Sequence, residues 1–509
     1  MGHVPLPTGA SRLDLRAAAA ITARDAAPYL RRVPGLLAFA VPLAIYLVSS
    51  YHDVMYWDVG EMDTVPYILG IAHPPGFPLY TLIGWAFTHA FPIGSVAFRM
   101  SALSALALAA TAWLVWRVVV DESGNAIAGL LAALLFAFGE DVWTHATRAE
   151  AHALVALACV AELCFLLRWL RRGRARDLYA CALALGLGLA VHPIVAWTIP
   201  GLLAAIIARA HVTVSRVYRV AAAIACVSAA VWFFYLPLRS AYVNAQHLDP
   251  LAQLGITGGA FWNYGDPVLV DNFTALVTGA GVAVQGVRFG YTADTFTDGF
   301  VHFLGFAVSE LTPIGCVLAL AGLIVLFRRD LTRAIVACAT MLPGPIFAFG
   351  LGAESDVDRY LLPAFALFAV AAGIALAALR PPSARHAAQA FAALAVVYLL
   401  LSQPHFFDQP HDARAADDAA EILRATPPDA IVIATWVLAP PLAYDDYVLH
   451  ETSRRLIVPA WYGDEIDVLA RWDAARPVYV AGTPEGSVPG FHLERMPTHV
   501  ELYRVVADR

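Results

Sequence analysis

The chain has 509 residues, of which 60% are hydrophobic and only 14% are charged, and its formal net charge is −7 at pH 7. A soluble domain is usually about half apolar and about a quarter charged, so this composition excludes an ordinary soluble protein. The acidic balance, with no basic stripe apart from arginines that flank apolar runs, excludes nucleic acid as a partner. The composition indicates a mostly α-helical, polytopic membrane protein.

Long apolar runs predict about eleven membrane spans, because a helix needs roughly 20 apolar residues to cross the hydrocarbon core. The predicted spans lie near residues 33–51, 98–120, 125–139, 150–170, 178–191, 194–210, 220–237, 301–327, 334–352, 360–380 and 387–402. Arginine clusters fall at alternate ends of these runs, so the arginine-rich side is predicted to be cytoplasmic. The N-terminus is then cytoplasmic and the C-terminus lies on the outer side.

These spans divide the chain into three parts. Residues 1–32 form a cytoplasmic tail, residues 33–402 form a transmembrane body with outer loops at 52–97 and 239–300, and residues 403–509 form an extracytoplasmic domain. In this last part, "ADDAAEILRAT" is typical of an amphipathic helix, and "AIVIAT", "RRLIVPA" and "RPVYVAG" are typical of short buried strands. We therefore expect a small α/β domain. It has no G-x-G-x-x-G sequence, so nothing in it indicates a nucleotide.

The first outer loop contains "WDVGE", which places Asp58 and Glu61 three residues apart, on one face of a helix. Trp57 precedes them, and the proline-rich "HPPGFPLY" that follows includes His73 and Tyr80. Prolines restrict the backbone, which suits a preorganised site, and a carboxylate suits a general base. The alternative is a loop whose acids are simply solvated.

Further ionisable residues interrupt apolar runs near the same side of the membrane. They are Arg148 and Glu150 in "THATRAEAH", His192 in "LAVHPIVAW", Arg239 after "FFYLPL" and Arg359 after "ESDVD". Ionisable groups at membrane depth are costly and tend to face a cavity or a partner. Arginine binds phosphate through its bidentate fork, so this set suits an anionic phosphate beside an acidic loop. Taken singly, each arginine could instead reach the interface and each histidine could be structural.

Several motifs together resemble a bacterial membrane family related to the animal transmembrane protein O-mannosyltransferase. They are "YWDVGEM", "YILGIAHPPGFPLYTLIG", "VAFRMSALSAL", "TRAEAHALVAL", "GLGLAVHP", "YLPLRS", "WNYGDP" and "DRYLLPAF". The resemblance spans most of residues 33–380 and implies a glycosyltransferase fold of the GT-C type. It also implies location in the bacterial inner membrane and a polyprenyl-phosphate-linked sugar as donor. Relatives commonly have tyrosine where this chain has His152, and a Gly-Asp pair where it reads "ATWVLAPP".

The resemblance implies transfer of mannose or a similar hexose to a hydroxyl of a protein or cell-envelope glycan on the outer side. It assigns the general base to Asp58, and one base predicts inversion at the anomeric carbon. Glu61 is the alternative base, or it positions Asp58 and the acceptor. Arg148, Arg239 and Arg359 are expected to bind the donor phosphate. The residues expected to contact substrate are Trp57, His73, Tyr80, Glu150, His192, Trp262 and Asp266.

No cofactor is expected, since no His or Cys ligand spacing enforces a metal, although the acids of the first loop could accept a divalent cation. Two other functions fit a polytopic membrane protein. A transporter or flippase of lipid-linked substrates predicts charges near the membrane midplane and paired broken helices. A non-catalytic membrane scaffold leaves the acid and arginine set without a role.

Overall fold

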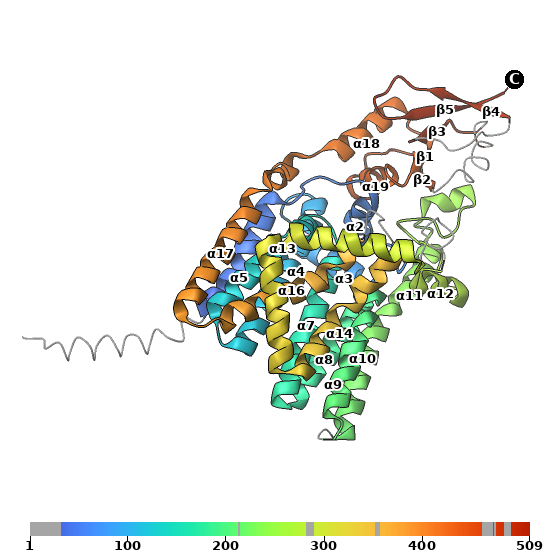
Figure 1. The fold of residues 1–509 in the computed structure, drawn as a ribbon. Coiled ribbons are helices and arrows are strands. Elements are labelled where there is room, and N and C mark those ends of the chain that lie inside the picture. The colour runs from blue at the N-terminus through green and yellow to red at the C-terminus, as the bar shows by residue number, and fades with distance from the viewer. Residues whose placement is uncertain are drawn as a thin grey trace, which may run out of the picture.

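The computed structural model describes residues 32–211, 214–280, 290–351, 357–460, 472, 475–482 and 490–508. The predicted cytoplasmic tail, residues 1–32, lies outside the described residues except for Arg32, and residues 281–289 of the second predicted outer loop lie outside them too. A helical body makes up most of the structure, and a small sheet with its helices covers one end of that body (Figure 1).

The helical body follows from long apolar sequences whose ends carry helix-capping residues. In α4, for example, the Ser95 hydroxyl accepts the Phe98 N–H at 3.0 Å at the start, and Gly124 ends the helix with φ 73°. The helices of the body are Arg32–Ser49, α2 (Trp57–Ile68), α3 (Pro78–Ala90), α4 (Val96–Ser123), α5 (Ala126–Ala137), α6 (Glu140–Ala146), α7 (Ala151–Arg172), α8 (Ala175–Val191), α9 (Ile199–Arg209), α10 (Ser215–Phe233), α11 (Tyr235–Gln246), α12 (Val270–Thr278), α13 (Ala293–Arg329), α14 (Leu331–Met341), α15 (Pro343–Ala348), α16 (Leu362–Ala378) and α17 (Pro382–Leu401).

Seven helical segments in the described part of the chain are long and apolar enough to cross a membrane, or eight if the bent pair α5–α6 is one span. The predicted count of about eleven is therefore not confirmed. The other four predicted spans coincide with α5, which is bent by 72° from α6, with α8 and α16 of 17 residues each, and with Pro193–Arg209. Nearly all of α16 is buried among other helices, so its hydropathy reflects packing inside the protein rather than contact with lipid.

Close helix packing in the body depends on small residues. Where α13 crosses α16, a Cβ atom added to Gly322 would lie 1.7 Å from the Ala371 carbonyl oxygen. Small residues let helix backbones approach closely, which is the main source of packing energy between helices in lipid. α13 itself is kinked at Thr312, whose φ is 61°, and Figure 1 shows its first half lying across the body and its second half running along it.

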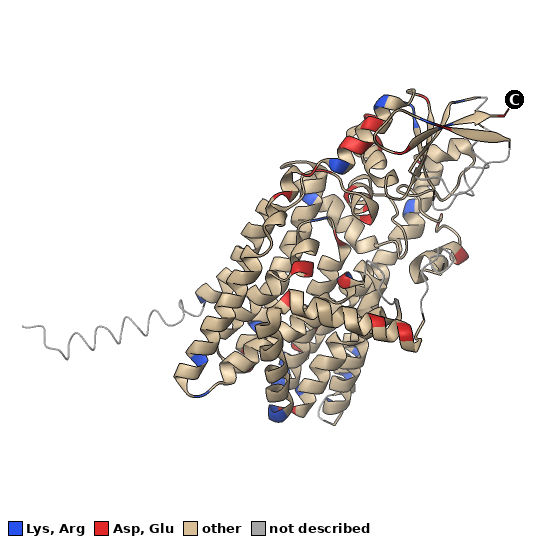
Figure 2. Ribbon diagram, turned by 45° about the horizontal axis from the view of Figure 1, so that its top comes forward, with Lys and Arg blue, Asp and Glu red and all other residues tan. Residues whose placement is uncertain are grey.

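Ion pairs tie together the end of the body that lies away from the sheet, where Figure 2 shows several arginines. Arg171 Nη1 lies 2.9 Å from Glu122 Oε1, and Arg117 Nη2 lies 3.0 Å from Asp121 Oδ1. Glu122 also contacts Arg333 at the start of α14. This is the side that the arginine distribution predicts to be cytoplasmic, and the orientation remains a prediction.

The C-terminal part contains α18 (Arg414–Ala425), α19 (Ala439–Tyr444) and a five-stranded sheet, which confirms the predicted small α/β fold. The strands are β1 (Ile431–Thr435), β2 (Leu456–Ala460), β3 (Val478–Ala481), β4 (Phe491–Arg495) and β5 (Leu502–Ala507), in the order β2-β1-β3-β5-β4. β1 pairs in parallel with β2 and β3, whereas β5 pairs antiparallel with β3 and β4. α19 packs on α2, so this domain lies directly over the first loop after the Arg32–Ser49 helix (Figure 1).

Candidate active site

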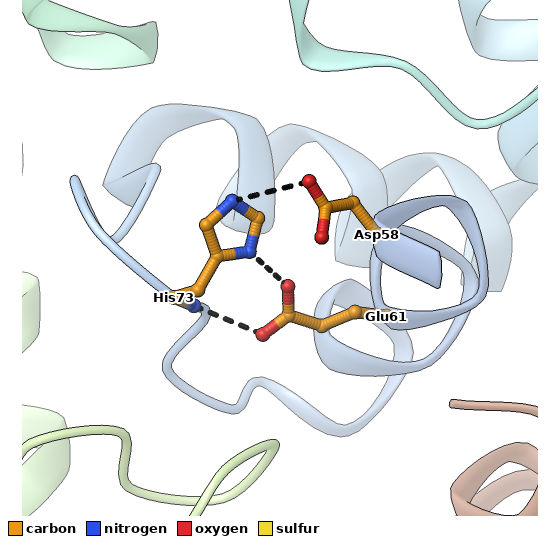
Figure 3. Close-up of side chains that lie close together, drawn as sticks. All are labelled: Asp58, Glu61 and His73. Atoms are coloured by element: carbon orange, nitrogen blue, oxygen red, sulfur yellow. Dashed lines mark hydrogen bonds and ion pairs between the residues drawn. The ribbon is translucent and has the colours of Figure 1, made fainter. Parts of the chain in front are cut away.

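Helix α2 carries the two carboxylates that the sequence singled out, and both point towards His73 (Figure 3). Asp58 and Glu61 are one helical turn apart, so they lie on the same face of α2. Glu61 is fully buried; it accepts the His73 backbone N–H at 2.9 Å and also bonds to the Nδ1 atom of the ring. The opposite ring nitrogen, Nε2, lies 3.8 Å from Asp58 Oδ2. His73 therefore lies between two carboxylates.

This arrangement fixes the charges of the cluster. Burial alone would lower the pKa of His73, but the carboxylates of Glu61 and Asp58 outweigh it and raise that pKa to about 9. Burial alone would raise the pKa of Asp58, but His73, Arg359 and a hydrogen bond from Trp436 outweigh it and lower that pKa below its ordinary value. At neutral pH the site thus holds an imidazolium beside an ionised Asp58.

Two residues distant in sequence complete the surroundings of Asp58. Arg359, in the turn Asp358–Tyr360 before α16, places Nη1 3.6 Å from Asp58 Oδ2. Trp436 follows β1 in the C-terminal domain and donates its indole N–H to Asp58 Oδ1 at 2.8 Å. Its ring stacks on Phe261, with centroids 5.7 Å apart. Trp436 was not predicted from the sequence; its only signal was that "ATWVLAPP" departs from the sequence usual in relatives.

A cavity of about 330 Å³ opens beside Asp58 and brings together six of the predicted residues. Those six are Trp57, Asp58, His73, Arg148, Glu150 and Arg359. Glu150 accepts the His152 Nδ1–H at 2.8 Å, and its other oxygen lies 3.7 Å from Arg148 Nη2. His152 also lines the cavity. Acidic and basic side chains from α2, the α6–α7 junction and the turn before α16 thus surround one space.

The remaining predicted residues lie elsewhere. His192 is behind the cavity wall, with its ring 5.0 Å from that of His152 and 5.4 Å from that of Phe77. Tyr80 is fully buried in α3, and its hydroxyl has no hydrogen-bond partner among the described residues. Glu61 is close to the cavity but does not line it, because its carboxylate faces His73.

Arg239, Trp262 and Asp266 do not join the cavity. The Arg239 guanidinium donates to the carbonyls of Ile68 and Leu69 and so caps the C-terminal end of α2. Asp266 Oδ1 accepts hydrogen bonds from Ser240, Asn244 and Asn263, at 2.8, 2.9 and 3.2 Å. These bonds stabilise the loop that contains Asp266 and connect it to α11. Trp262 lines a second cavity, between the helical body and the C-terminal domain. The sequence could not separate these residues from the first cavity, because all of them are predicted on the same side of the membrane.

The cluster of Asp58, Glu61 and His73 has the geometry for a divalent cation, since one ligand atom from each lies within 4.8 Å of the others. Carboxylate oxygens and an imidazole suit such ions. The imidazole would have to lose its proton first, because only the neutral ring binds a metal. With the pKa of His73 raised to about 9, proton and metal would compete for this position.

Residues 58–215 match the family domain described as "Protein O-mannosyl-transferase TMEM260 N-terminal domain". The chain is 26% identical over 434 residues to Protein O-mannosyl-transferase TMEM260 of Mus musculus, covering 78% of this chain and 58% of that protein. It is 33% identical over 141 residues to Protein O-mannosyl-transferase tmem260 of Dictyostelium discoideum, covering 27% of this chain and 17% of that protein. The chain thus spans less than two thirds of the length of either relative.

Among solved structures, the fold is similar to ArnT from Cupriavidus metallidurans bound to undecaprenyl phosphate, with a TM-score of 0.58 and 14% identity. That alignment covers 92% of this chain and 97% of ArnT. The apo state of the same protein gives a TM-score of 0.59, again at 14% identity, over 93% and 97% of the two chains. The chain is therefore similar in sequence to the TMEM260 protein O-mannosyl-transferases, matches their N-terminal domain over residues 58–215, and has a fold similar to that of ArnT.

Proposed function

We propose that the chain is a membrane glycosyltransferase that moves a hexose, mannose or a similar sugar, from a polyprenyl-phosphate donor to an acceptor hydroxyl on the extracytoplasmic side. The observation that carries this proposal is that one cavity is lined by Asp58 together with Arg148 and Arg359. The names of the relatives, and the undecaprenyl phosphate bound to ArnT, support the same reaction class and the same kind of donor lipid.

Asp58 acts as the general base. Its carboxylate is ionised at neutral pH and lines the cavity, so it can accept the proton of an acceptor hydroxyl. The acceptor oxygen then bonds to the anomeric carbon while the bond from that carbon to the phosphate oxygen breaks. One base without a nucleophilic carboxylate gives direct displacement and inversion at the anomeric carbon. Glu61 serves to orient His73, because its carboxylate is buried against that residue.

The positive groups of the cavity stabilise the leaving phosphate. Arg148 and Arg359 both line the cavity, and the His73 imidazolium adds a third positive charge. A polyprenyl phosphate leaves as an anion, so charge stabilisation replaces a general acid. Removing one well-placed group of this kind reduces the rate on the order of 10²–10³-fold. No metal is part of this mechanism, and Arg239 is left out because its donors are engaged with carbonyls of α2.

The test is release of labelled sugar from a panel of polyprenyl-phosphate hexoses by the purified full chain, with cell-envelope extract as acceptor. Wild type is compared with Asp58→Asn, which keeps the shape of the side chain, and with Asp408→Asn, an exposed carboxylate outside the cavity, as the control. Turnover by wild type and by the control, with Asp58→Asn folded and inert, would support the proposal. An active Asp58→Asn variant would show that a residue other than Asp58 serves as the general base. A folded wild type that is inert on every donor would favour a flippase or a scaffold.

A further inference from the structure

His145, in α6, is a buried ionisable residue that has no part in the mechanism above. Its side chain is fully buried, and a polar group in that position is costly unless it is hydrogen-bonded. It lies three residues before Arg148, one of the two arginines that the proposed mechanism uses to stabilise the leaving phosphate. Arg148 lines the first cavity and His145 does not, so any effect of His145 on the reaction must act through a neighbouring residue.

The hydrogen bonds of the imidazole define its tautomer. Nδ1 lies 2.7 Å from the Asp141 carbonyl oxygen, one turn earlier in α6. A carbonyl oxygen can only accept, so Nδ1 carries the hydrogen. Nε2 lies 3.1 Å from Arg148 Nη2. A guanidinium can only donate, so Nε2 presents a lone pair and the ring is neutral.

The charged groups that face His145 come from three elements. Glu150 Oε2, at the start of α7, and Asp358 Oδ2, in the turn before α16, each lie 3.9 Å from Nε2, beyond hydrogen-bond distance. Asp141 belongs to α6 itself, and the Arg148 guanidinium faces the same ring nitrogen as the two carboxylates. Protonation of Nε2 would replace the lone pair by an N–H group and set two cations side by side, so it would break the contact with Arg148.

A neutral acceptor holds Arg148 without cancelling its charge. The guanidinium makes no other hydrogen bond with a described residue, and its Nη2 lies 3.7 Å from Glu150 Oε2. Without the imidazole, the guanidinium would be free to move onto this carboxylate, and a close ion pair would neutralise it. An anionic phosphate requires the positive charge to stay available.

We infer that His145 is a positioning residue: its neutral imidazole accepts a hydrogen bond from Arg148 and keeps that guanidinium in the first cavity, apart from Glu150, for the donor phosphate. This inference rests on the proposed function and adds to it the residue that keeps one phosphate-binding arginine available. Because His145 acts through Arg148, its effect is confined to the donor and does not reach the acceptor.

Two amide substitutions separate the roles of the two ring nitrogens. The amide in His145→Asn takes the place of Nδ1, so it still donates to the Asp141 carbonyl but ends short of Arg148. The amide in His145→Gln reaches the place of Nε2, so its oxygen accepts from Arg148 and does not titrate. Arg148→Gln removes the cation, and the double variant with His145→Asn completes a double-mutant cycle. His89→Asn, at an exposed position on α3, is the control.

The full chain in detergent is assayed for sugar transfer from the donor that wild type uses. His145→Asn should lower kcat/KM for the donor on the order of tenfold and leave the KM for the acceptor unchanged, because one hydrogen bond to a charged group is lost. His145→Gln should restore the wild-type value. In the Arg148→Gln background, His145→Asn should cause no further loss. Losses that multiply in the double variant would overturn the positioning role, and so would equal losses in the two amide variants.

A binding measurement separates this inference from the proposed function. Thermal stabilisation of the purified chain by farnesyl phosphate, compared with farnesol, reports phosphate binding without sugar transfer. His145→Asn should bind farnesyl phosphate more weakly than wild type and His145→Gln. That result, with a wild type that is inert on every sugar donor, would support the positioning role and refute the proposed function. Equal stabilisation of wild type and His145→Asn would overturn the positioning role, whether or not wild type transfers sugar.

A comparison of wild type with His145→Gln alone tests the inference without the asparagine variant. Glutamine does not titrate, so His145→Gln should keep its affinity for farnesyl phosphate at an acidic pH where protonation of His145 weakens binding to wild type. The phosphate itself titrates equally in both measurements, so the ratio of the two affinities reports the protein. A ratio that is constant with pH would contradict the role of the neutral imidazole.

Discussion

Trp436 offers the sharpest test of how the C-terminal domain serves the candidate active site. Trp436→Phe removes the indole N–H that Asp58 Oδ1 accepts at 2.8 Å. The phenylalanine ring can still stack on Phe261, because the present rings are nearly parallel, at 15°. The substitution thus removes mainly one hydrogen bond to a carboxylate and leaves the stacking on Phe261 in place.

The magnitude follows from the exposure of Asp58. A hydrogen bond to a charged group contributes about 1.5–3 kcal/mol. The Asp58 side chain is 29% exposed, so water partly replaces the lost donor and the lower value, about 1.5 kcal/mol or roughly one pKa unit, applies. The hydrogen bond lowers the pKa of Asp58, so its removal should raise that pKa. The active, ionised form is then lost at a higher pH.

The assay is the pH dependence of kcat/KM for sugar transfer, from pH 3.5 to 8, with the donor that wild type uses. The acid limb of the Trp436→Phe profile should move up by about one unit, while the rate at pH 8 falls by less than the rate at pH 4. Trp85→Phe, an indole on α3 that is 39% exposed, controls for loss of a tryptophan. A loss that is equal at every pH would show that Trp436 acts on packing alone and would refute this reasoning.

Three further predictions concern the charge cluster and the packing of the body. The pKa of His73 is raised from 6.5 to about 9, so it contributes stability that is complete below pH 6.5 and lost as pH rises through about 9. The melting temperature of wild type should therefore fall between pH 7 and 10, and His73→Gln should flatten that dependence; parallel curves would contradict the assignment. Incubation with EDTA should leave transfer unchanged because the imidazolium already supplies a positive charge between the carboxylates, whereas loss with EDTA and recovery with Mn²⁺ would place a metal there. Gly322→Ala should destabilise the chain by about 1–3 kcal/mol because its Cβ would meet the Ala371 carbonyl, and thermal unfolding should show a lower Tm than for Gly305→Ala, where the same helix has open space. Equal Tm values would show that α13 and α16 can separate without loss.

The sequence predicted the elements of the fold better than their relation to the membrane. Apolar runs located the helices of the body, and three of the five strands of the outer domain were predicted from short runs of buried residues. β4 was missed because it is an edge strand whose residues are largely exposed, so it lacks that signal. The span count was not confirmed because hydropathy does not distinguish a helix buried in protein, such as α16, from one that faces lipid.

The candidate site was predictable where its residues are close in sequence. Asp58, Glu61 and His73 belong to one loop, and their spacing indicated that they act together. Arg239 and Arg359 looked alike, since each adjoins an apolar run, yet one caps α2 and the other contacts Asp58. Only the packing of the helices separates these roles. Trp436 has no charge and lies in a different domain, so no local pattern could connect it with Asp58.

The contact between Trp436 and Asp58 joins residues that are 378 positions apart in the chain. At about 5–20 residues per second, roughly 20–75 seconds of synthesis pass between the emergence of the two residues. The other residues around Asp58, up to Arg359, are synthesised before Trp436, so this contact forms last. The nascent chain therefore holds its carboxylate without the indole that completes its surroundings. A protein arrested or truncated before the outer domain would keep His73 and Arg359 beside Asp58 but lack the indole N–H, so the pKa of Asp58 would lie above its value in the complete chain.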